Sequence, residues 1–177
     1  MLPAISLGYH IPELGSPEFY ALSVLASVLA GGESSKLYRL LVHDKNWATD
    51  LAVGPNQYKG PELFQIWCQV QSGVDIKKVL GAIDEELKKN QEICLSHQEI
   101  QKAKNKIAFR FVSRLAKISQ IGELLAHYAV FHDDPYLINH HLDYFLAVTK
   151  EEIRAVAQQI FQKKNRTLLI VETQKEN

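Results

Sequence analysis

Cysteine and net charge are both scarce in this chain of 177 residues. Cys68 and Cys94 are its two cysteines, too few for a disulfide framework, and they do not form a C-x-x-C zinc or redox motif. Twenty basic and twenty acidic side chains cancel, which argues against a protein dedicated to nucleic acid or to membrane surfaces. The longest apolar run, residues 21–30, is interrupted by serines and is too short to cross a bilayer, so we expect no membrane insertion.

Motifs for several kinds of catalysis are also missing. A zinc peptidase helix needs H-x-x-E-H, in which two histidines four residues apart bind the metal and the glutamate activates water. Residues 10–14 come nearest, but Leu14 stands where the second histidine is required and Pro12 interrupts any helix. The chain also lacks a G-x-S-x-G nucleophile elbow and a G-x-x-x-x-G-K-[ST] phosphate loop. We therefore expect no catalytic residue and no metal ligand in this chain.

A second group of histidines and carboxylates leaves two interpretations open. The group could hold a metal ion or form a solvated helix start. The solvated helix start is favoured because acidic residues commonly cap helices. Adjacent histidines on a helix also point about 100° apart, so they do not easily share a metal ion. The group consists of His132, Asp133, Asp134, His140, His141 and Asp143.

Basic side chains recur every four residues further upstream, which predicts a basic ridge along one helix. A solvated helix face is the favoured interpretation, and a contact surface for an acidic partner domain or, less favoured, for nucleic acid is the alternative. The ridge consists of Lys102, Lys106, Arg110 and Arg114.

Hydropathy periods predict an α+β fold, and the chain length favours one domain spanning residues 1–177, which we expect to be a fragment or half of a longer chain. Alternating apolar residues predict strands, and helical spacing predicts the helices between them. Capping boxes of Ser96 with Glu99 and of Thr149 with Glu152 mark two of the helix starts. We expect a mainly antiparallel sheet of about four strands that helices cover on one face, with the second and third strands joined as an antiparallel hairpin. The predicted strands are 2–9, 48–53, 63–71 and 166–172; the predicted helices are 16–30, a short one from about 35, one from 75, 96–131 with a break near Gly122, 135–148 and 149–160.

The stretch 16–47 carries the most specific pattern in the sequence. An apolar helix that Ser16 can cap is followed by Gly31-Gly32, a predicted hinge, after which Ser34 or Ser35 can cap a second, shorter helix containing Leu37.

This pattern, G-G-x-S-S-R/K-L between two predicted helices, resembles the second homologous domain of the pitrilysin-type zinc metallopeptidases. That family includes insulin-degrading enzyme and the mitochondrial processing peptidase. The resemblance covers nearly the whole chain and implies the inactive half of such a peptidase, with no cofactor of its own. It also implies a zinc-bearing homologous domain or subunit as partner, on the same chain or another, zinc in that partner, and an unfolded peptide as substrate. A bacterial periplasm or cell envelope is the location we expect, although no signal peptide follows Met1.

Competent members of this family often carry an arginine and a tyrosine seven residues apart that help hold substrate. The resemblance places that pair on Val42 and Thr49. Neither side chain can replace an arginine or a tyrosine, which argues against direct participation in catalysis. The alternative function is a purely structural subunit of the same fold, like the core subunits of respiratory complex III, with no proteolytic role.

Overall fold

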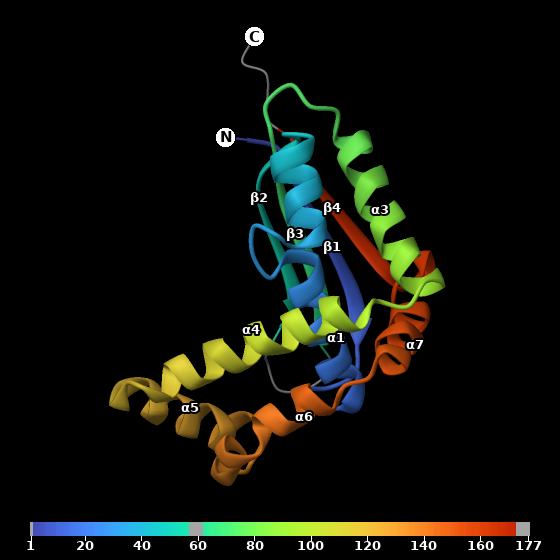
Figure 1. Cartoon of the computed structure of the whole chain (residues 1–177). Coiled ribbons are helices and arrows are strands. Elements are labelled where there is room, and N and C mark those ends of the chain that lie inside the picture. Colours follow the sequence, from blue (N-terminus) through green and yellow to red (C-terminus); the bar gives the residue numbers. More distant parts are fainter. Residues whose placement is uncertain (1, 57–61, 173–177) are drawn as a thin grey trace.

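The computed structural model describes residues 2–56 and 62–172 of the chain, as a sheet with helices packed against it (Figure 1). Four strands form one antiparallel sheet in the order β2-β3-β1-β4. Their bounds are β1 Ala4–Ile11, β2 Ala48–Pro55, β3 Glu62–Val70 and β4 Arg166–Val171. The predicted hairpin between the second and third strands is confirmed, and its loop around residues 59–61 lies outside the described residues.

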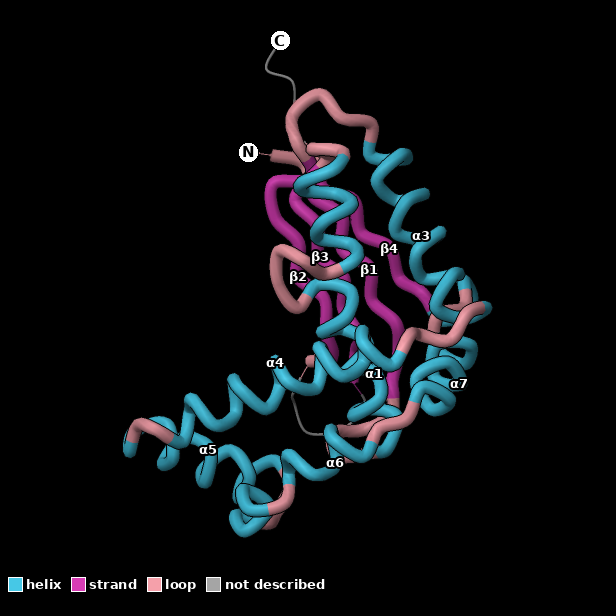
Figure 2. The backbone as a smooth tube through the Cα atoms, viewed as in Figure 1, coloured by secondary structure: helices cyan, strands magenta, loops and turns pink. Residues whose placement is uncertain are grey.

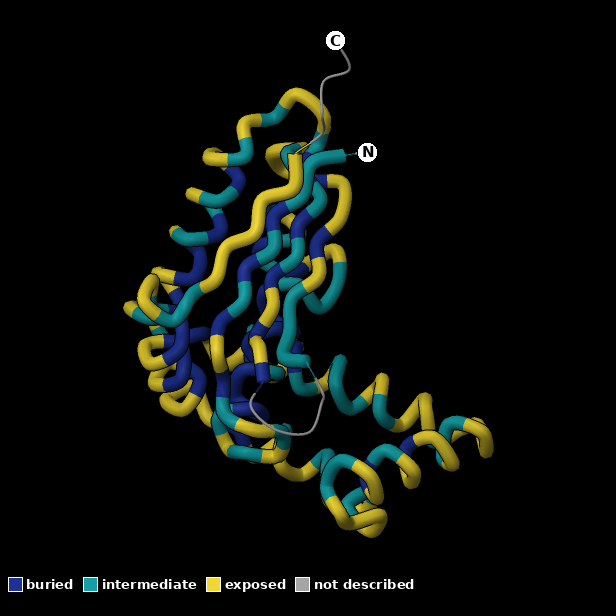
Figure 3. Tube along the Cα trace, turned by 180° about the vertical axis from the view of Figure 1, so that it is seen from behind, coloured by how far each residue is buried: buried dark blue, intermediate teal, exposed yellow. Residues whose placement is uncertain are grey.

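The sheet has one covered and one open face, as predicted. Phe64, Ile66, Cys68 and Val70 are fully buried on β3, while the residues between them are exposed or partly exposed. Figure 3, seen from behind, shows the same alternation along β1 and β3, whereas β4 is exposed along most of its length. The register aligns buried residues of β1 with buried residues of β3, so their side chains form one layer of the core.

Helix α1, Pro17–Ala30, lies in the centre of the covered face. Ser16 caps it as predicted, because its side chain accepts a hydrogen bond from the backbone N–H of Phe19 at 3.2 Å. Ten of its residues are buried, which is more than one amphipathic stripe contains. The helix is buried on most sides because β2 lies on one side of it and α4 and α7 pack on others.

The predicted short helix after the glycines is present in an unusual form. Helix α2, Lys36–Tyr38, continues directly as the π-helix η1, Arg39–Asp44. Leu37 and Leu41 are fully buried and anchor this segment to the core.

Two further helices flank the sheet at its β4 side. Helix α3, Ile76–Glu92, begins at the cap Asp75, and helix α7, Lys150–Ile160, begins at the predicted capping box of Thr149 and Glu152. A short 3₁₀ turn, η3 (Lys163–Asn165), leads from α7 into β4.

Two long helices form an arm that projects from the body of the molecule (Figures 1 and 2). We call helices α4, His97–Leu115, and α5, Ile118–Phe131, the arm. The predicted break near Gly122 is wrong: α4 ends at Leu115 with Ala116 as its C-cap, Lys117 is extended, and Gly122 lies inside α5. Apolar spacing continues across this boundary, so hydropathy alone could not locate the turn that lets α5 contact α4.

After the arm, the predicted helix 135–148 is divided in two. The 3₁₀ helix η2, Pro135–Asn139, precedes helix α6, His141–Ala147, which packs against α1 and α4. Within the described residues, no helix is long and apolar enough to cross a membrane.

We expect substitution of Leu25 by alanine to lower the free energy of unfolding by about 2–5 kcal/mol, because Leu25 is fully buried in α1 and its loss leaves a cavity. Urea unfolding measures the change. Leu146→Ala, at a position that is 41% exposed in α6, is the control and should cost much less.

Candidate functional site: the glycine hinge and the arm

The two glycines of the hinge meet different constraints. Gly31 ends α1 by donating its N–H to the carbonyl of Ser27 at 3.0 Å, and a Cβ added to Gly31 would overlap that carbonyl oxygen. Gly32 has φ +149°, in the region that side chains with a Cβ rarely adopt. Each position thus favours glycine for a backbone reason.

The following motif residues fix the short second helix. Ser35 is buried, and its hydroxyl donates to the carbonyl of Gly32, so it closes the hinge without acting as a side-chain cap. Ser34 is exposed and accepts a hydrogen bond from Lys102 at 2.8 Å. Leu37 is fully buried and contributes to the core.

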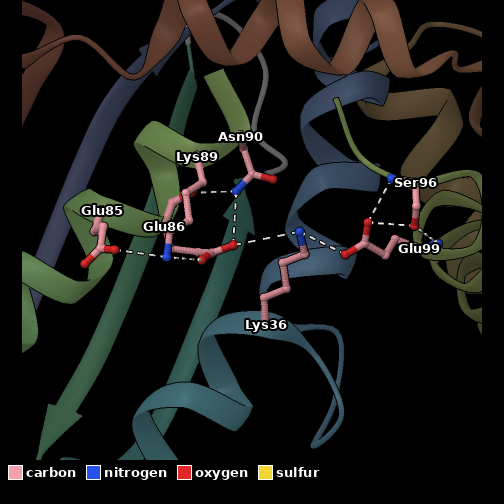
Figure 4. Close-up of polar contacts among 7 residues, drawn as sticks. All are labelled: Lys36, Glu85, Glu86, Lys89, Asn90, Ser96 and Glu99. Atoms are coloured by element: carbon pink, nitrogen blue, oxygen red, sulfur yellow. Dashed lines mark hydrogen bonds and ion pairs between the residues drawn. The ribbon is translucent and has the colours of Figure 1, made fainter. Parts of the chain in front are cut away.

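Lys36, the basic residue of the motif, ties three helices together (Figure 4). Its ammonium group lies 2.9 Å from a carboxylate oxygen of Glu99 on α4 and 3.9 Å from Glu86 on α3. Burial alone would raise the pKa of Glu99, but hydrogen bonds from Lys36 and Ser96 bring this pKa below its ordinary value. Glu86 is buried, and its backbone carbonyl and carboxylate accept hydrogen bonds from the side-chain amide of Asn90. The network therefore spans the hinge, α3 and the start of α4.

The basic ridge of α4 is mostly exposed, as interpreted from the sequence, with Lys106 partly buried, and it also binds the hinge. Arg110 donates to the carbonyl of Gly31 at 2.9 Å, and Lys106 lies 3.5 Å from the same oxygen. Burial, with the charges of Lys102 and Arg110 adding to it, lowers the pKa of Lys106. In the described part of the chain, no residue of the ridge pairs with a carboxylate, so the arm presents uncompensated positive charge beside the hinge.

The two positions of the substrate pair lie on either side of the turn into β2. Val42, in η1, is partly buried and packs against the hydrophobic core. Thr49 is exposed at a register shift in β2, and its hydroxyl lies 3.1 Å from the side-chain oxygen of Gln69 on β3. A contact of either position with substrate stays a prediction.

The histidine group is only partly a solvated helix start. Asp134 caps η2 as expected, and His140 is exposed near Asp143. His132 and His141 instead form a partly buried cluster with His127 and the fully buried ring of Tyr128. Interpretation of these two histidines as solvated is therefore wrong, because the turn after α5 brings residues distant in sequence against α1.

The proton positions in this histidine cluster follow from its burial. Burial, with His132 and His127 adding to it, lowers the pKa of His141 to about 4, and burial raises the pKa of Tyr128 to about 12. Both groups are therefore neutral at pH 7, and we assign the Tyr128 hydroxyl, 2.5 Å from Nδ1 of His141, as the donor. The hydrogen of the neutral imidazole then lies on Nε2, which has no partner among the described residues.

A zinc ion does not fit these histidines. Over residues 2–56 and 62–172, no group of three His, Cys, Asp or Glu side chains is arranged to hold a metal. His141 already uses Nδ1 for Tyr128. The sequence itself lacks the H-x-x-E-H helix.

An α+β domain with the G-G-x-S-S-K-L hinge and no zinc-binding helix defines the class: the non-metal half of a zinc-peptidase fold. The model of the peptidase M16 inactive domain matches residues 2–107, more than half of the chain. The chain belongs to this family, so the resemblance predicted from its sequence is confirmed.

Known relatives agree with this classification. The chain is 27% identical over 160 residues to the zinc protease PqqE of Helicobacter pylori, a match that covers 89% of the chain and 35% of that protein. Among solved structures, a protease from Helicobacter pylori superposes with a TM-score of 0.89 at 22% identity, covering 97% of this chain and 41% of the other. The inactive peptidase domain of a zinc protease-like protein from Bordetella parapertussis superposes with a TM-score of 0.87 at 24% identity, covering 99% and 93%. The chain thus spans about a third of the curated relative.

Substitution of Gly32 by valine should lower the melting temperature by several degrees. A β-branched residue at φ +149° is strained by about 1–2 kcal/mol, which corresponds to roughly 2–8 °C for a domain of this size. Calorimetry of the variant and of Gly122→Val, in a helix with open space around the glycine, separates backbone strain from a general loss of helix propensity. An unchanged melt for Gly32→Val would contradict the hinge role.

The free energy of unfolding should fall as the solution is acidified through the pKa values of the three partly buried histidines. Burial lowers the pKa values of His127, His132 and His141 below their ordinary value of 6.5; Arg114 lowers that of His127 further, while Asp134 partly opposes the shift at His132. The unfolded chain therefore binds more protons below pH 6.5, so stability present above that pH is lost as pH falls toward about 4.

For His141 alone, the loss by pH 5 is at most about 2 kcal/mol, given its partial exposure. Urea unfolding between pH 7.5 and 4.5 measures it. His141→Phe should flatten the dependence, whereas His140→Gln, at an exposed position, should preserve it. If the free energy of unfolding depends on pH equally in both variants, groups other than His141 cause the dependence.

Proposed function

We propose that this chain is the inactive half of a pitrilysin-type zinc peptidase. In this proposal it pairs with a zinc-bearing homologous domain, closes a chamber over it and helps bind an unfolded peptide. The chain supplies no zinc ligand; the metal belongs to the partner half. Membership in the M16 inactive-domain family and the relative described as a zinc protease support this proposal.

The observation that carries the pairing is the apolar surface of the arm. Five large hydrophobic residues of α4 and α5 are exposed on an element that projects from the body of the molecule (Figure 1). Burying such a surface against a partner is favourable by about 25 cal/mol per Å². These residues are Phe109 (75% exposed), Val112 (58%), Ile118 (90%), Leu125 (38%) and Val130 (60%).

The sheet offers a place for an extended peptide. Strand β3 is hydrogen-bonded to β2 and β1 on its two sides, so it has no free edge. Strand β2 lies at one edge of the sheet and begins beside Thr49, the position of one member of the substrate pair. An extended chain can add to such an edge through backbone hydrogen bonds, so we assign peptide binding to the edge of β2.

The double substitution Val112→Asp with Ile118→Asp should weaken assembly with a zinc-bearing half by about tenfold or more. Two carboxylates would replace apolar contacts with groups that are costly to desolvate at an interface. Analytical ultracentrifugation measures the association, and peptide cleavage by the mixture measures activity. We expect cleavage from the mixture with the unmodified chain and none from this chain alone.

Ser113→Asp with Ser119→Asp is the matched control. It adds the same charge one residue further along each helix, at exposed polar positions, and should preserve assembly. Equal binding by both double variants would exclude the arm as the pairing surface. Normal assembly with no cleavage in any mixture would favour the purely structural subunit.

Restoring the family pair, as Val42→Arg with Thr49→Tyr, should raise peptide turnover by the assembled protein. A charge-assisted hydrogen bond from arginine to substrate contributes about 1.5–3 kcal/mol, or roughly tenfold or more in rate if it forms in the transition state. Steady-state kinetics with zinc content held equal measures the gain. Flat turnover in a folded variant would show that these positions do not face substrate.

A further inference from the structure

A cavity of about 310 Å³ lies where the arm meets the body. Its walls come from five elements of the chain: α1, the end of β2, α4, α5 and α6. This volume suits a small organic group of several carbons rather than a single ion. We call it the arm cavity.

One side of the arm cavity is apolar. Ala26 and Ala30 line it from α1, Ile107 and Phe111 from α4, and Leu124 from α5. The small side chains of these two alanines leave space in the cavity, and a larger residue at either position would fill that space. This side favours the hydrocarbon part of a ligand.

The other side carries positive charge without a counter-ion. Arg110 and Arg114 both line the cavity from successive turns of α4, and no Asp or Glu is among the described residues that line it. Arg110 already donates to the carbonyl of Gly31. The side chain of Arg114 has no hydrogen bond or ion pair within the described residues, so its guanidinium group is free to bind an anion.

Two buried polar atoms beside the cavity also lack partners. Ser27, which is 8% exposed, lines the cavity, and its hydroxyl has no partner in the described part of the chain. His141 lines it too, and its Nε2, which carries the imidazole hydrogen when Tyr128 donates to Nδ1, is equally unpaired. A buried donor without a partner is unfavourable, and an acceptor brought by a ligand would supply the missing hydrogen bond.

We propose that the arm cavity binds a carboxylate that bears a compact apolar body. The carboxylate pairs with Arg114 at the mouth and accepts a hydrogen bond from the hydroxyl of Ser27 or from Nε2 of His141. The hydrocarbon lies against Ala30, Ile107 and Phe111. Two sources share this chemistry: the C-terminal residue of a peptide with an apolar side chain, and a free branched or medium-chain carboxylic acid. The site lies wholly within this chain and does not depend on pairing with a zinc-bearing half.

Calorimetric titration of the purified chain tests the proposal with defined probes. Acetyl-alanyl-leucine with a free carboxylate should bind, and its C-terminal amide should bind at least tenfold more weakly because it lacks the charge. 4-Methylpentanoate is the free-acid probe. If it binds as tightly as the peptide, the site recognises the carboxylate and the hydrocarbon alone; if it binds more weakly, the site recognises peptide C-termini. Equal binding of acid and amide, tighter binding of inorganic phosphate, or no binding of either acid would overturn the proposal.

Two variants and one control variant locate the site. Arg114→Gln should weaken binding of the acid at least tenfold, and Lys117→Gln, which removes the same charge from the end of the arm without lining the cavity, should leave it unchanged. Ala30→Phe should abolish binding by filling the apolar side. Thermal melts establish that each variant is folded, and unchanged binding by a folded Arg114→Gln protein would exclude the arm cavity as the site.

Discussion

Helix α1 is the element against which the rest of the structure packs. The inner face of the sheet, the hinge helix, α4, α6 and α7 all contact it, and Leu22, Leu25 and Leu29 are fully buried within it. Because the helix is covered on most sides, the hydrophobic effect acts on nearly every residue between Phe19 and Leu29. The chain can leave this crowded position only through a sharp turn, which explains why two glycines follow it.

The hinge makes that turn and also joins the arm to the body. Its carbonyl groups lack helical partners, and the cations of α4 supply donors for the carbonyl of Gly31. Lys36 adds ion pairs that reach α3 and α4 from the opposite direction. The motif that identifies the family therefore acts in this chain as a structural junction, and the binding surfaces that we propose lie around it, on the arm and at the edge of β2.

The arm combines features that favour contact with other molecules. Its outer surface exposes large apolar residues, its basic ridge lacks carboxylate partners among the described residues, and a cavity with unpaired donors lies at its base. The histidine cluster at the end of α5 holds the arm against α1 while its imidazoles are neutral. Packing at the base of the arm is therefore sensitive to acid, whereas the junction at the hinge depends on charges that persist across the physiological pH range.

The sequence alone determined the class of fold, the faces of the strands, the caps at Ser16, Ser96 and Thr149, and the absence of a zinc-binding helix, because each of these depends on residues close together in the chain. Only the tertiary structure decided the turn at Ala116–Lys117, the contact of Arg110 with Gly31 and the burial of His141 against Tyr128. Apolar periodicity runs unbroken across that turn, and the other two contacts join residues 79 and 13 positions apart. The folding of the arm onto α1, rather than any local pattern, brings them together.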